Sequence, residues 1–173
     1  HCEKEKRHRQ QSVFQTSRGG HRKDVYRRNY GIDQSRLMNR MLVDSNVILD
    51  LFLNDPQWAD WSETTLNQYG ASNELVINPI VYTELSIGFN RIEELENAIE
   101  RAGFHLLEMP KEALFLAGKV FLQYRRNKGT KSSPLPDFFI GAHAAVLDVS
   151  LVTRDVTRYK TYFPTVNLIY PNV

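Results

Sequence analysis

The sequence of residues 41–173 predicts an α/β fold in which a mostly parallel sheet of roughly five strands lies between layers of helices. Short apolar segments alternate here with longer segments whose apolar residues recur at helical spacing. Strands separated by helices are normally joined by right-handed crossovers, so neighbouring strands run parallel. At 173 residues, the chain is long enough for one domain of this kind.

The strand predictions depend on short apolar runs that end at polar or turn-forming residues. The first run, after Met41, stops at Asp44, and the others are also bounded by polar residues, Gly or Pro. The expected strands are residues 41–43, 74–77, 104–107, 150–153 and 166–169.

The helix predictions depend on apolar periodicity and on Pro and Gly at the boundaries. Pro56 and Pro79 suit first helical turns, whereas Gly70 and Gly103 suit helix ends. The last expected helix is rich in Ala and Gly, which favours close packing against the sheet. The expected helices are residues 46–53, 57–69, 79–89, 91–102, 111–126 and 137–147.

The charge of the chain changes abruptly at Met41. Residues 1–40 contain 11 Lys and Arg against 4 Asp and Glu, whereas residues 41–173 contain 11 against 16. The first segment is poor in aliphatic residues, so we expect it to be disordered. It is either a basic arm for nucleic acid or, as we favour, a non-native extension before a natural start at Met41. The expected domain is residues 41–173.

The composition also indicates the cellular compartment. The single cysteine, Cys2, excludes an internal disulfide and suits a reducing environment. No apolar run approaches the roughly 20 residues that span a bilayer, and the first 30 residues lack the apolar core of a signal peptide. We therefore expect a cytoplasmic protein with no membrane partner.

Four acidic residues lie at strand or helix boundaries. Asp44 ends the first strand, Glu84 lies on the helix after the second strand, Asp137 begins a helix and Asp155 follows the fourth strand. The carboxyl ends of parallel strands meet at one edge of a sheet, so these carboxylates are expected to gather there. Such a group repels itself unless a cation is present, and its oxygen ligands suit Mg²⁺ or Mn²⁺.

The other polar residues have simpler interpretations. Asp137 alone would also make a good helix cap. Neither His105 nor His143 has a partner at zinc-site spacing, so both are expected to be structural. The remaining acids of interest are expected at the surface or in caps: Asp50, Asp55, Asp60, Glu63, Glu93, Glu94, Glu96 and Glu100.

Around the four boundary acids the sequence resembles the four motifs of PIN-domain ribonucleases, most closely the VapC-type toxins of type II toxin–antitoxin pairs. The matching segments are residues 43–48, 82–84, 135–142 and 151–155. Each motif alone is weak, but four acids in order at separations of 40, 53 and 18 residues are specific. The resemblance covers residues 41–173 and implies a PIN-like three-layer α/β/α sandwich.

The resemblance also implies a metal site. Asp44 and Asp137 would be the direct ligands of Mg²⁺ or Mn²⁺, and Glu84 and Asp155 would complete the site directly or through water. The residues that would orient these groups are Ser45, Asn46 and Thr153.

The chain departs from the family pattern just after Asp155. Related sequences often carry a further acid at this point, whereas this chain has Thr157, Arg158 and Tyr159. A fifth acidic ligand is therefore doubtful, and a second metal site is expected to be weak.

The implied activity is hydrolysis of RNA phosphodiester bonds by metal-activated water. The implied partners are RNA, a small cognate antitoxin and a second copy of the chain in a homodimer. The basic residues expected to bind RNA around the acidic centre are Arg125, Arg126, Lys128, Lys131, Arg154, Arg158 and Lys160.

Three alternative functions remain open on the sequence. The first is a stand-alone RNA-processing PIN nuclease. The second is a phosphohydrolase with Asp44 as nucleophile, although that class usually has a second Asp two residues on, where this chain has Asn46. The third is a non-catalytic RNA-binding or antitoxin-binding relic of the fold.

Overall fold

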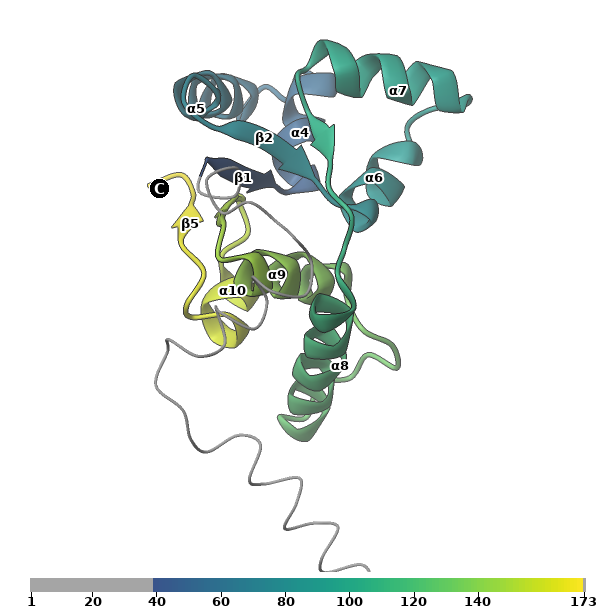
Figure 1. The fold of residues 1–173 in the computed structure, drawn as a ribbon, viewed down its shortest axis with the longest axis vertical. Helices are drawn as coiled ribbons and strands as arrows, with labels where there is room; N and C mark the ends of the chain where they lie inside the picture. Colours follow the sequence, from purple (N-terminus) through teal and green to yellow (C-terminus); the bar gives the residue numbers. More distant parts are fainter. Residues whose placement is uncertain (1–38, 173) are drawn as a thin grey trace, which may run out of the picture. The chain divides into compact units, whose positions relative to one another are not determined.

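The computed structural model describes residues 39–172. The extension expected at residues 1–40 therefore lies, apart from its last two residues, outside the described residues. The elements in the described part (Figure 1) are β1 (Arg40–Val43), α4 (Ser45–Phe52), α5 (Ala59–Gly70), β2 (Glu74–Ile77), α6 (Pro79–Ser86), α7 (Ile92–Arg101), β3 (His105–Leu106), α8 (Lys111–Arg126), α9 (Pro136–Leu147), β4 (Ser150–Val152), α10 (Thr157–Tyr162) and β5 (Leu168–Ile169).

The strands form one five-stranded sheet in the order β3-β2-β1-β4-β5, and every pair is parallel. The central strand is β1, in which Met41 lies opposite Leu75 of β2 and Ser150 of β4. The three central strands are buried because helices cover both of their faces, which explains why they are almost continuously apolar. The predicted α/β class is confirmed.

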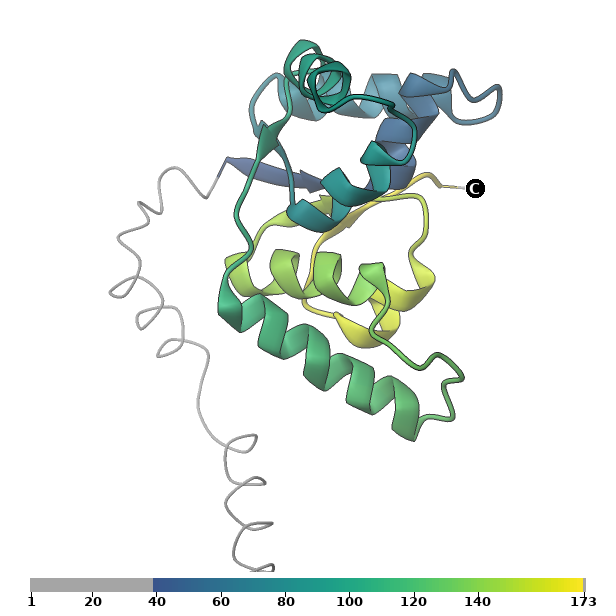
Figure 2. The ribbon, with the colours of Figure 1, turned by 90° about the vertical axis from the view of Figure 1, so that its right-hand side faces the viewer.

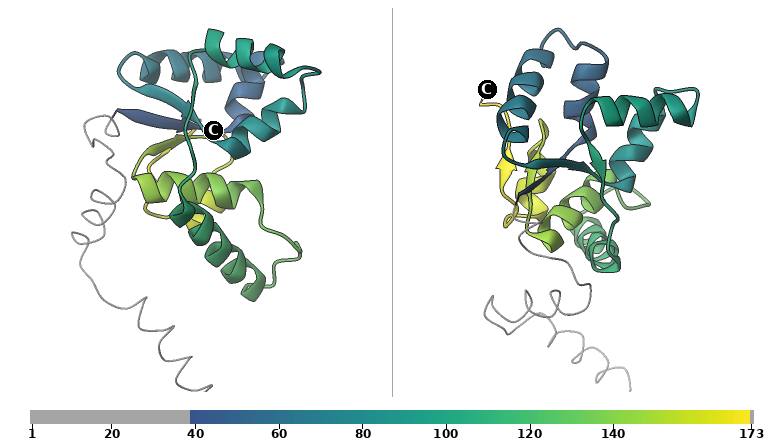
Figure 3. Two further views of the ribbon diagram at one scale, coloured as in Figure 1. Left: turned by 45° about the vertical axis from the view of Figure 1, so that its right-hand side comes forward. Right: turned by 45° about the horizontal axis from the view of Figure 1, so that its top comes forward.

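Helices cover both faces of the sheet, as the three-layer prediction requires. In Figures 1 and 2, α4, α5 and α7 lie on one side of the strands, and α8, α9 and α10 lie on the other. Helix α6 lies close to the carboxyl ends of the strands and contacts α4, α7 and α9 (Figure 3). Within residues 39–172, none of the helices is both long enough and apolar enough to cross a membrane.

Most predicted elements are confirmed to within two residues, with three differences. The strands β3 and β5 each have two residues rather than the expected four. The helix expected at 79–89 ends at Ser86. Helix α10 was not predicted, although Tyr159 and Phe163, four residues apart, are both buried.

One acidic residue was wrongly expected at the surface or in a cap. Asp50 is only 2% exposed, because it lies three residues after the buried Val47 on the inner face of α4. Ser62 of α5 donates a 2.7 Å hydrogen bond to Oδ2 of Asp50, and Nε of Arg154 lies 2.9 Å from the same oxygen. The Nε–H bond of Arg154 does not point at that oxygen, so the contact is an ion pair rather than a hydrogen bond.

The starts of α6 and α9 place two of the boundary acids. Asn78 caps α6 by accepting hydrogen bonds from the backbone N–H groups of Ile80 and Val81, so Glu84 lies in the second turn of that helix. In α9, Pro136 occupies the first turn and Leu135 is the N-cap, without a side-chain cap bond. Asp137 therefore lies inside the first turn and does not cap the helix.

Candidate active site

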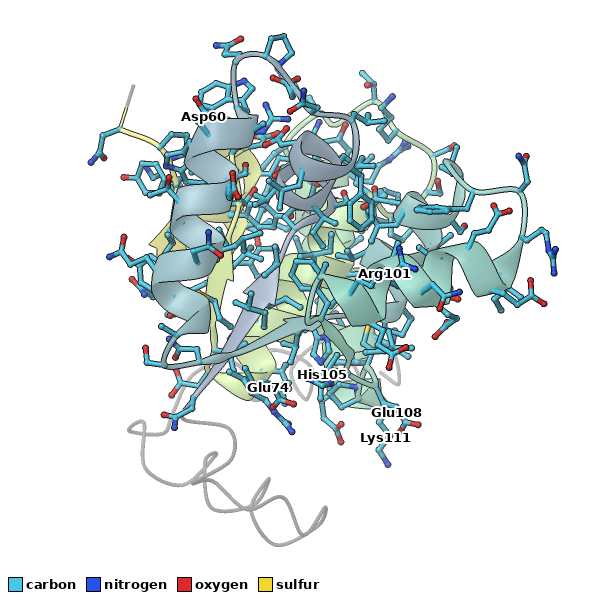
Figure 4. The ribbon with its side chains drawn as sticks, turned by 90° about the horizontal axis from the view of Figure 1, so that it is seen from above. Asp60, Glu74, Arg101, His105, Glu108 and Lys111 are labelled. Atoms are coloured by element: carbon cyan, nitrogen blue, oxygen red, sulfur yellow. The ribbon has the colours of Figure 1, made fainter. Side chains whose placement is uncertain are left out.

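The four boundary acids belong to segments at the carboxyl ends of the central strands. Asp44 directly follows β1, and Asp155 lies three residues after the end of β4. Glu84 and Asp137 are contributed by α6 and α9, two helices that contact each other. The opposite end of the sheet is marked by Glu74 and His105, the first residues of β2 and β3 (Figure 4).

Asp44 is the most deeply buried of the four acids, with 4% of its surface exposed. Its Oδ2 atom accepts hydrogen bonds from Thr153 Oγ1 at 2.7 Å, Asn46 Nδ2 at 3.0 Å and the Tyr159 hydroxyl at 3.1 Å. Three donors on one carboxylate oxygen fix the orientation of the side chain. They leave Oδ1 as the oxygen that faces Ser45, whose Oγ lies 3.5 Å away.

The pKa of the Asp44 carboxyl is raised to about 6. Burial is the main cause, and the negative charges of Asp137 and Glu84 add to it, whereas the hydrogen bonds from Thr153 and Tyr159 lower the pKa. The charges of Asp137 and Glu84 therefore act on Asp44.

Ser45 links Asp44 to the acid of α6. Its Oγ donates a 2.8 Å hydrogen bond to Oε2 of Glu84 and also lies near Asp44. Burial raises the pKa of Glu84, and so does the charge of Asp137, while the bond from Ser45 lowers it. The half-buried Glu84 is therefore held in place by a residue adjacent to Asp44.

Asp137 and Asp155 share a cationic neighbour on α10. Nη1 of Arg158 lies 2.5 Å from Oδ2 of Asp137 and 3.9 Å from Oδ2 of Asp155. The other oxygen of Asp155 accepts a hydrogen bond from the backbone N–H of Thr157 at the start of α10. Asp155 is about half exposed, so it is the most solvated of the four acids.

Asn46 and Thr153 connect β1 to the loop after β4. Besides its bond to Asp44, Asn46 accepts a 3.2 Å hydrogen bond from the backbone N–H of Arg154. Oγ1 of Thr153 accepts a bond from the backbone N–H of Asp155. Ser45, Asn46 and Thr153 are the three residues expected from the sequence to orient the acids. Each of them contacts an acid of the cluster.

The sequence did not point to Tyr159 as a site residue. Its side chain is 1% exposed, and burial together with the charge of Asp44 raises the pKa of its hydroxyl well above the ordinary value. The hydroxyl is therefore a permanent donor to Asp44. The detectable signal was the apolar spacing of Val156, Tyr159 and Phe163, which fits one face of a short helix.

The donor set suits a hard divalent cation. Within residues 39–172, no three carboxylate, imidazole or thiol groups lie close enough to hold a metal ion together. Nevertheless, Asp44, Glu84 and Asp137 are close enough for each to feel the charge of another, and burial adds to the cost of that repulsion. A divalent ion would relieve it, and carboxylate oxygens are the ligands that Mg²⁺ and Mn²⁺ prefer.

The basic residues expected to bind RNA fall into two groups. Arg154 and Arg158 are engaged in the ion pairs described above. The other five are exposed: Arg125, Arg126, Lys128, Lys131 and Lys160.

The loop between α8 and α9 has a defined local structure. Nη1 of Arg125 donates a 2.7 Å hydrogen bond to the carbonyl of Lys131. The hydroxyl of Tyr124 accepts bonds from the backbone N–H groups of Thr130 and Lys131. The basic residues of this loop are therefore presented on a folded turn that leads directly into α9 and Asp137.

The family is shown by sequence comparison. A family model of the PIN domain matches residues 41–163. The chain belongs to the PIN domain family. Proteins of this family are generally nucleases. Among curated proteins, no sequence matches this PIN domain protein.

Solved structures with the same fold include three that cover most of the chain. The VapBC2 complex of Rickettsia felis, bound to a promoter DNA fragment, has 17% identity and a TM-score of 0.61 over 77% of this chain and 99% of that chain. VapBC-1 from nontypeable Haemophilus influenzae has 20% identity and a TM-score of 0.57, and FitAcB from Neisseria gonorrhoeae has 19% and 0.55. Both alignments cover 76% of this chain and 97% of the other. At such identities the likeness establishes the PIN fold alone.

Proposed function

We propose that this PIN domain is an endoribonuclease that hydrolyses RNA phosphodiester bonds with the help of Mg²⁺ or Mn²⁺. The observation that carries the proposal is the shared electrostatic environment of Asp44, Glu84 and Asp137 at the carboxyl ends of the strands. A carboxylate cluster of this kind repels a phosphodiester unless a divalent ion reverses the local charge.

Asp44 and Asp137 would hold the ion, with Glu84 and Asp155 completing the site. When bound, the ion supplies positive charge that polarises a phosphoryl oxygen and lowers the pKa of water. The remaining task of the chain is orientation. Three donors fix Oδ2 of Asp44, and the Ser45 hydroxyl fixes Glu84, so neither carboxylate has to be ordered during the reaction.

RNA would be held by cations outside the acidic centre. The exposed basic residues of the α8–α9 loop and of α10 have the charge to contact phosphates, which attract Lys and Arg whatever the base sequence. Lys160 also lies 4.2 Å from the centre of the Tyr170 ring, an aromatic surface suited to stacking on a base.

We further propose that the nuclease is the toxin of a toxin–antitoxin pair and acts as a homodimer. The support for the toxin role is that the three structural neighbours named above are described as VapBC or FitAcB, and that a Klebsiella pneumoniae neighbour is described as a toxin–antitoxin complex. The partners would then be RNA, a small antitoxin protein and a second copy of the chain.

The alternative with Asp44 as a covalent nucleophile is disfavoured by the geometry. An attacking carboxylate oxygen needs an open approach to phosphorus, whereas Asp44 is 4% exposed and three donors occupy its Oδ2.

The proposal is tested by digesting RNA with the full chain, with and without Mg²⁺ or Mn²⁺. Asp44→Asn keeps the shape of the side chain and removes its charge, so we expect loss of metal-dependent cleavage. Asp60→Asn, at an exposed acid of α5, is the matched control and should cleave as wild type does. A wild-type chain that leaves RNA intact, or an Asp44→Asn chain that cleaves normally, would overturn the proposal.

A further inference from the structure

Arg158 contributes a fixed positive charge within the acidic cluster. Its guanidinium contacts Asp137 at 2.5 Å and Asp155 at 3.9 Å, two of the four boundary acids. Burial alone would lower the pKa of Arg158, but the hydrogen bond and the charge of Asp137, together with Asp155, raise it. Arginine remains protonated in any case, so this charge is permanent.

The position of Arg158 is determined by the packing of α10 on α9. Tyr159, the next residue, is buried and hydrogen-bonded to Asp44. Phe163, at the end of α10, packs so closely on Gly141 of α9 that a Cβ atom there would lie 2.3 Å from the ring. Tyr159 and Phe163 thus attach α10 to Asp44 and to the helix that carries Asp137, and Arg158 directly precedes Tyr159.

We propose that Arg158 replaces a second divalent ion and limits this PIN domain to one metal ion. A two-metal site requires carboxylates that are available to both ions, which would lie about 3.5–4 Å apart. Here one oxygen of Asp137 is already paired with the guanidinium, and Asp155 lies in its field. A second divalent ion at these acids would have to displace the arginine or bind beside a positive charge.

The same contact limits the affinity of the single ion. Asp137 is an expected ligand, and its pairing with Arg158 lowers the negative charge available to a metal. Removing the guanidinium charge should therefore strengthen metal binding as well as permit a second ion. The inference rests on the proposed function only in treating the cluster as a divalent-ion site, because it makes no assumption about RNA.

The test is to count Mn²⁺ ions bound to the full chain by titration calorimetry and by the electron paramagnetic resonance signal of free Mn²⁺. We expect one ion per wild-type chain. In Arg158→Gln we expect a second ion and at least about tenfold tighter binding of the first, because a like charge a few ångströms away is gone. Arg158→Lys keeps the charge and should retain the wild-type count.

Arg101→Gln is the matched control, since it removes one positive charge from the exposed last turn of α7 (Figure 4). It should bind Mn²⁺ as wild type does. Two ions on the wild-type chain, no ion at all, or an unchanged count and affinity in Arg158→Gln would each overturn the inference. If Arg158→Gln weakens RNA binding but leaves Mn²⁺ binding unchanged, Arg158 is an RNA contact instead.

The Mn²⁺ measurement can succeed or fail independently of the proposed nuclease activity. The Mn²⁺ count is measured without RNA, so one ion on wild type and two on Arg158→Gln would support the inference even if no RNA is cleaved. If Arg158→Gln does not fold, as judged by circular dichroism, the wild-type count still decides, because two ions per chain contradict the inference.

Discussion

The hydroxyl of Tyr159 donates a 3.1 Å hydrogen bond to Oδ2 of Asp44, a residue 115 positions earlier in the chain. Asp44 follows the central strand, whereas Tyr159 lies on the short helix α10. This single contact therefore joins two segments far apart in the sequence of the PIN domain at the most buried of its four boundary acids. It also explains how α10, with six residues, is held at the candidate site.

Tyr159→Phe should weaken this connection while keeping the aromatic ring. A hydrogen bond to a charged group contributes roughly 1.5–3 kcal/mol, and the two other donors to Asp44 remain, so we expect a loss of about 1–2 kcal/mol in the free energy of unfolding. Urea denaturation at pH 7 in EDTA measures it. Tyr170→Phe, at a more exposed tyrosine whose hydroxyl accepts a hydrogen bond from the exposed Lys160, should be nearly neutral. Equal losses in the two variants would contradict the prediction.

Two glycines in adjacent helices should respond oppositely to alanine. A Cβ atom at Gly141 of α9 would lie 2.3 Å from the ring of the buried Phe163, so Gly141→Ala should destabilise by about 1–3 kcal/mol through overpacking. A Cβ atom at Gly118 of α8 meets nothing within 4 Å, so Gly118→Ala should stabilise by about 0.5–1 kcal/mol. Chemical denaturation of both variants against wild type tests the pair, and effects of the same sign would argue against it.

Asp50→Asn should be costly although Asp50 is not one of the four boundary acids. The substitution leaves Arg154 without its buried partner, which costs about 3–5 kcal/mol in a fully buried pair. Because Arg154 is 28% exposed, we expect about 2–3 kcal/mol from the same principle. Asp60→Asn removes an exposed acid from α5 and is the control for charge alone. A thermal or urea unfolding curve for Asp50→Asn that overlies that of Asp60→Asn would refute the role assigned to the pair.

The fold was largely predictable from the sequence because the patterns that specify strands and helices lie within short segments of the chain. Apolar runs that end at Asp44 and Ile77, and apolar periodicity over 111–126, specify strands and helices without knowledge of their neighbours. The parallel sheet then follows from the alternation of elements. The short strands β3 and β5 were overestimated because pairing, which is not local, determines where a strand ends.

The acidic cluster was predictable in part, and its partners were not. Topology brings strand ends together, so Asp44 and the other boundary acids could be grouped from their positions alone. Two ion pairs connect residues of different elements through long arginine side chains. They are Asp50 with Arg154 and Asp137 with Arg158. No periodicity in the sequence encodes such pairs, which is why Asp50 was expected at the surface.

His143 should make the PIN domain less stable as the pH falls below about 6.5. The side chain is fully buried in α9, neither ring nitrogen has a hydrogen-bond partner, and burial lowers its pKa from 6.5 to about 4. Between these two values the unfolded chain binds the proton and the folded chain does not, so stability is present near pH 7 and declines toward pH 4.

The loss attributable to His143 at pH 5 is about 2 kcal/mol relative to pH 7, since each pKa unit corresponds to about 1.4 kcal/mol. His143→Leu removes the titrating ring and with it this loss. The free energy of unfolding of the variant, taken relative to that of wild type, should therefore be about 2 kcal/mol higher at pH 5 than at pH 7. The raised pKa of Asp44 acts in the opposite direction, but it does so in both chains and cancels in the difference. Urea unfolding in EDTA at the two pH values measures the effect, with His105→Leu, at an exposed histidine of β3, as the control. A difference between His143→Leu and wild type that does not change with pH would show that His143 is already charged or solvated in the folded chain.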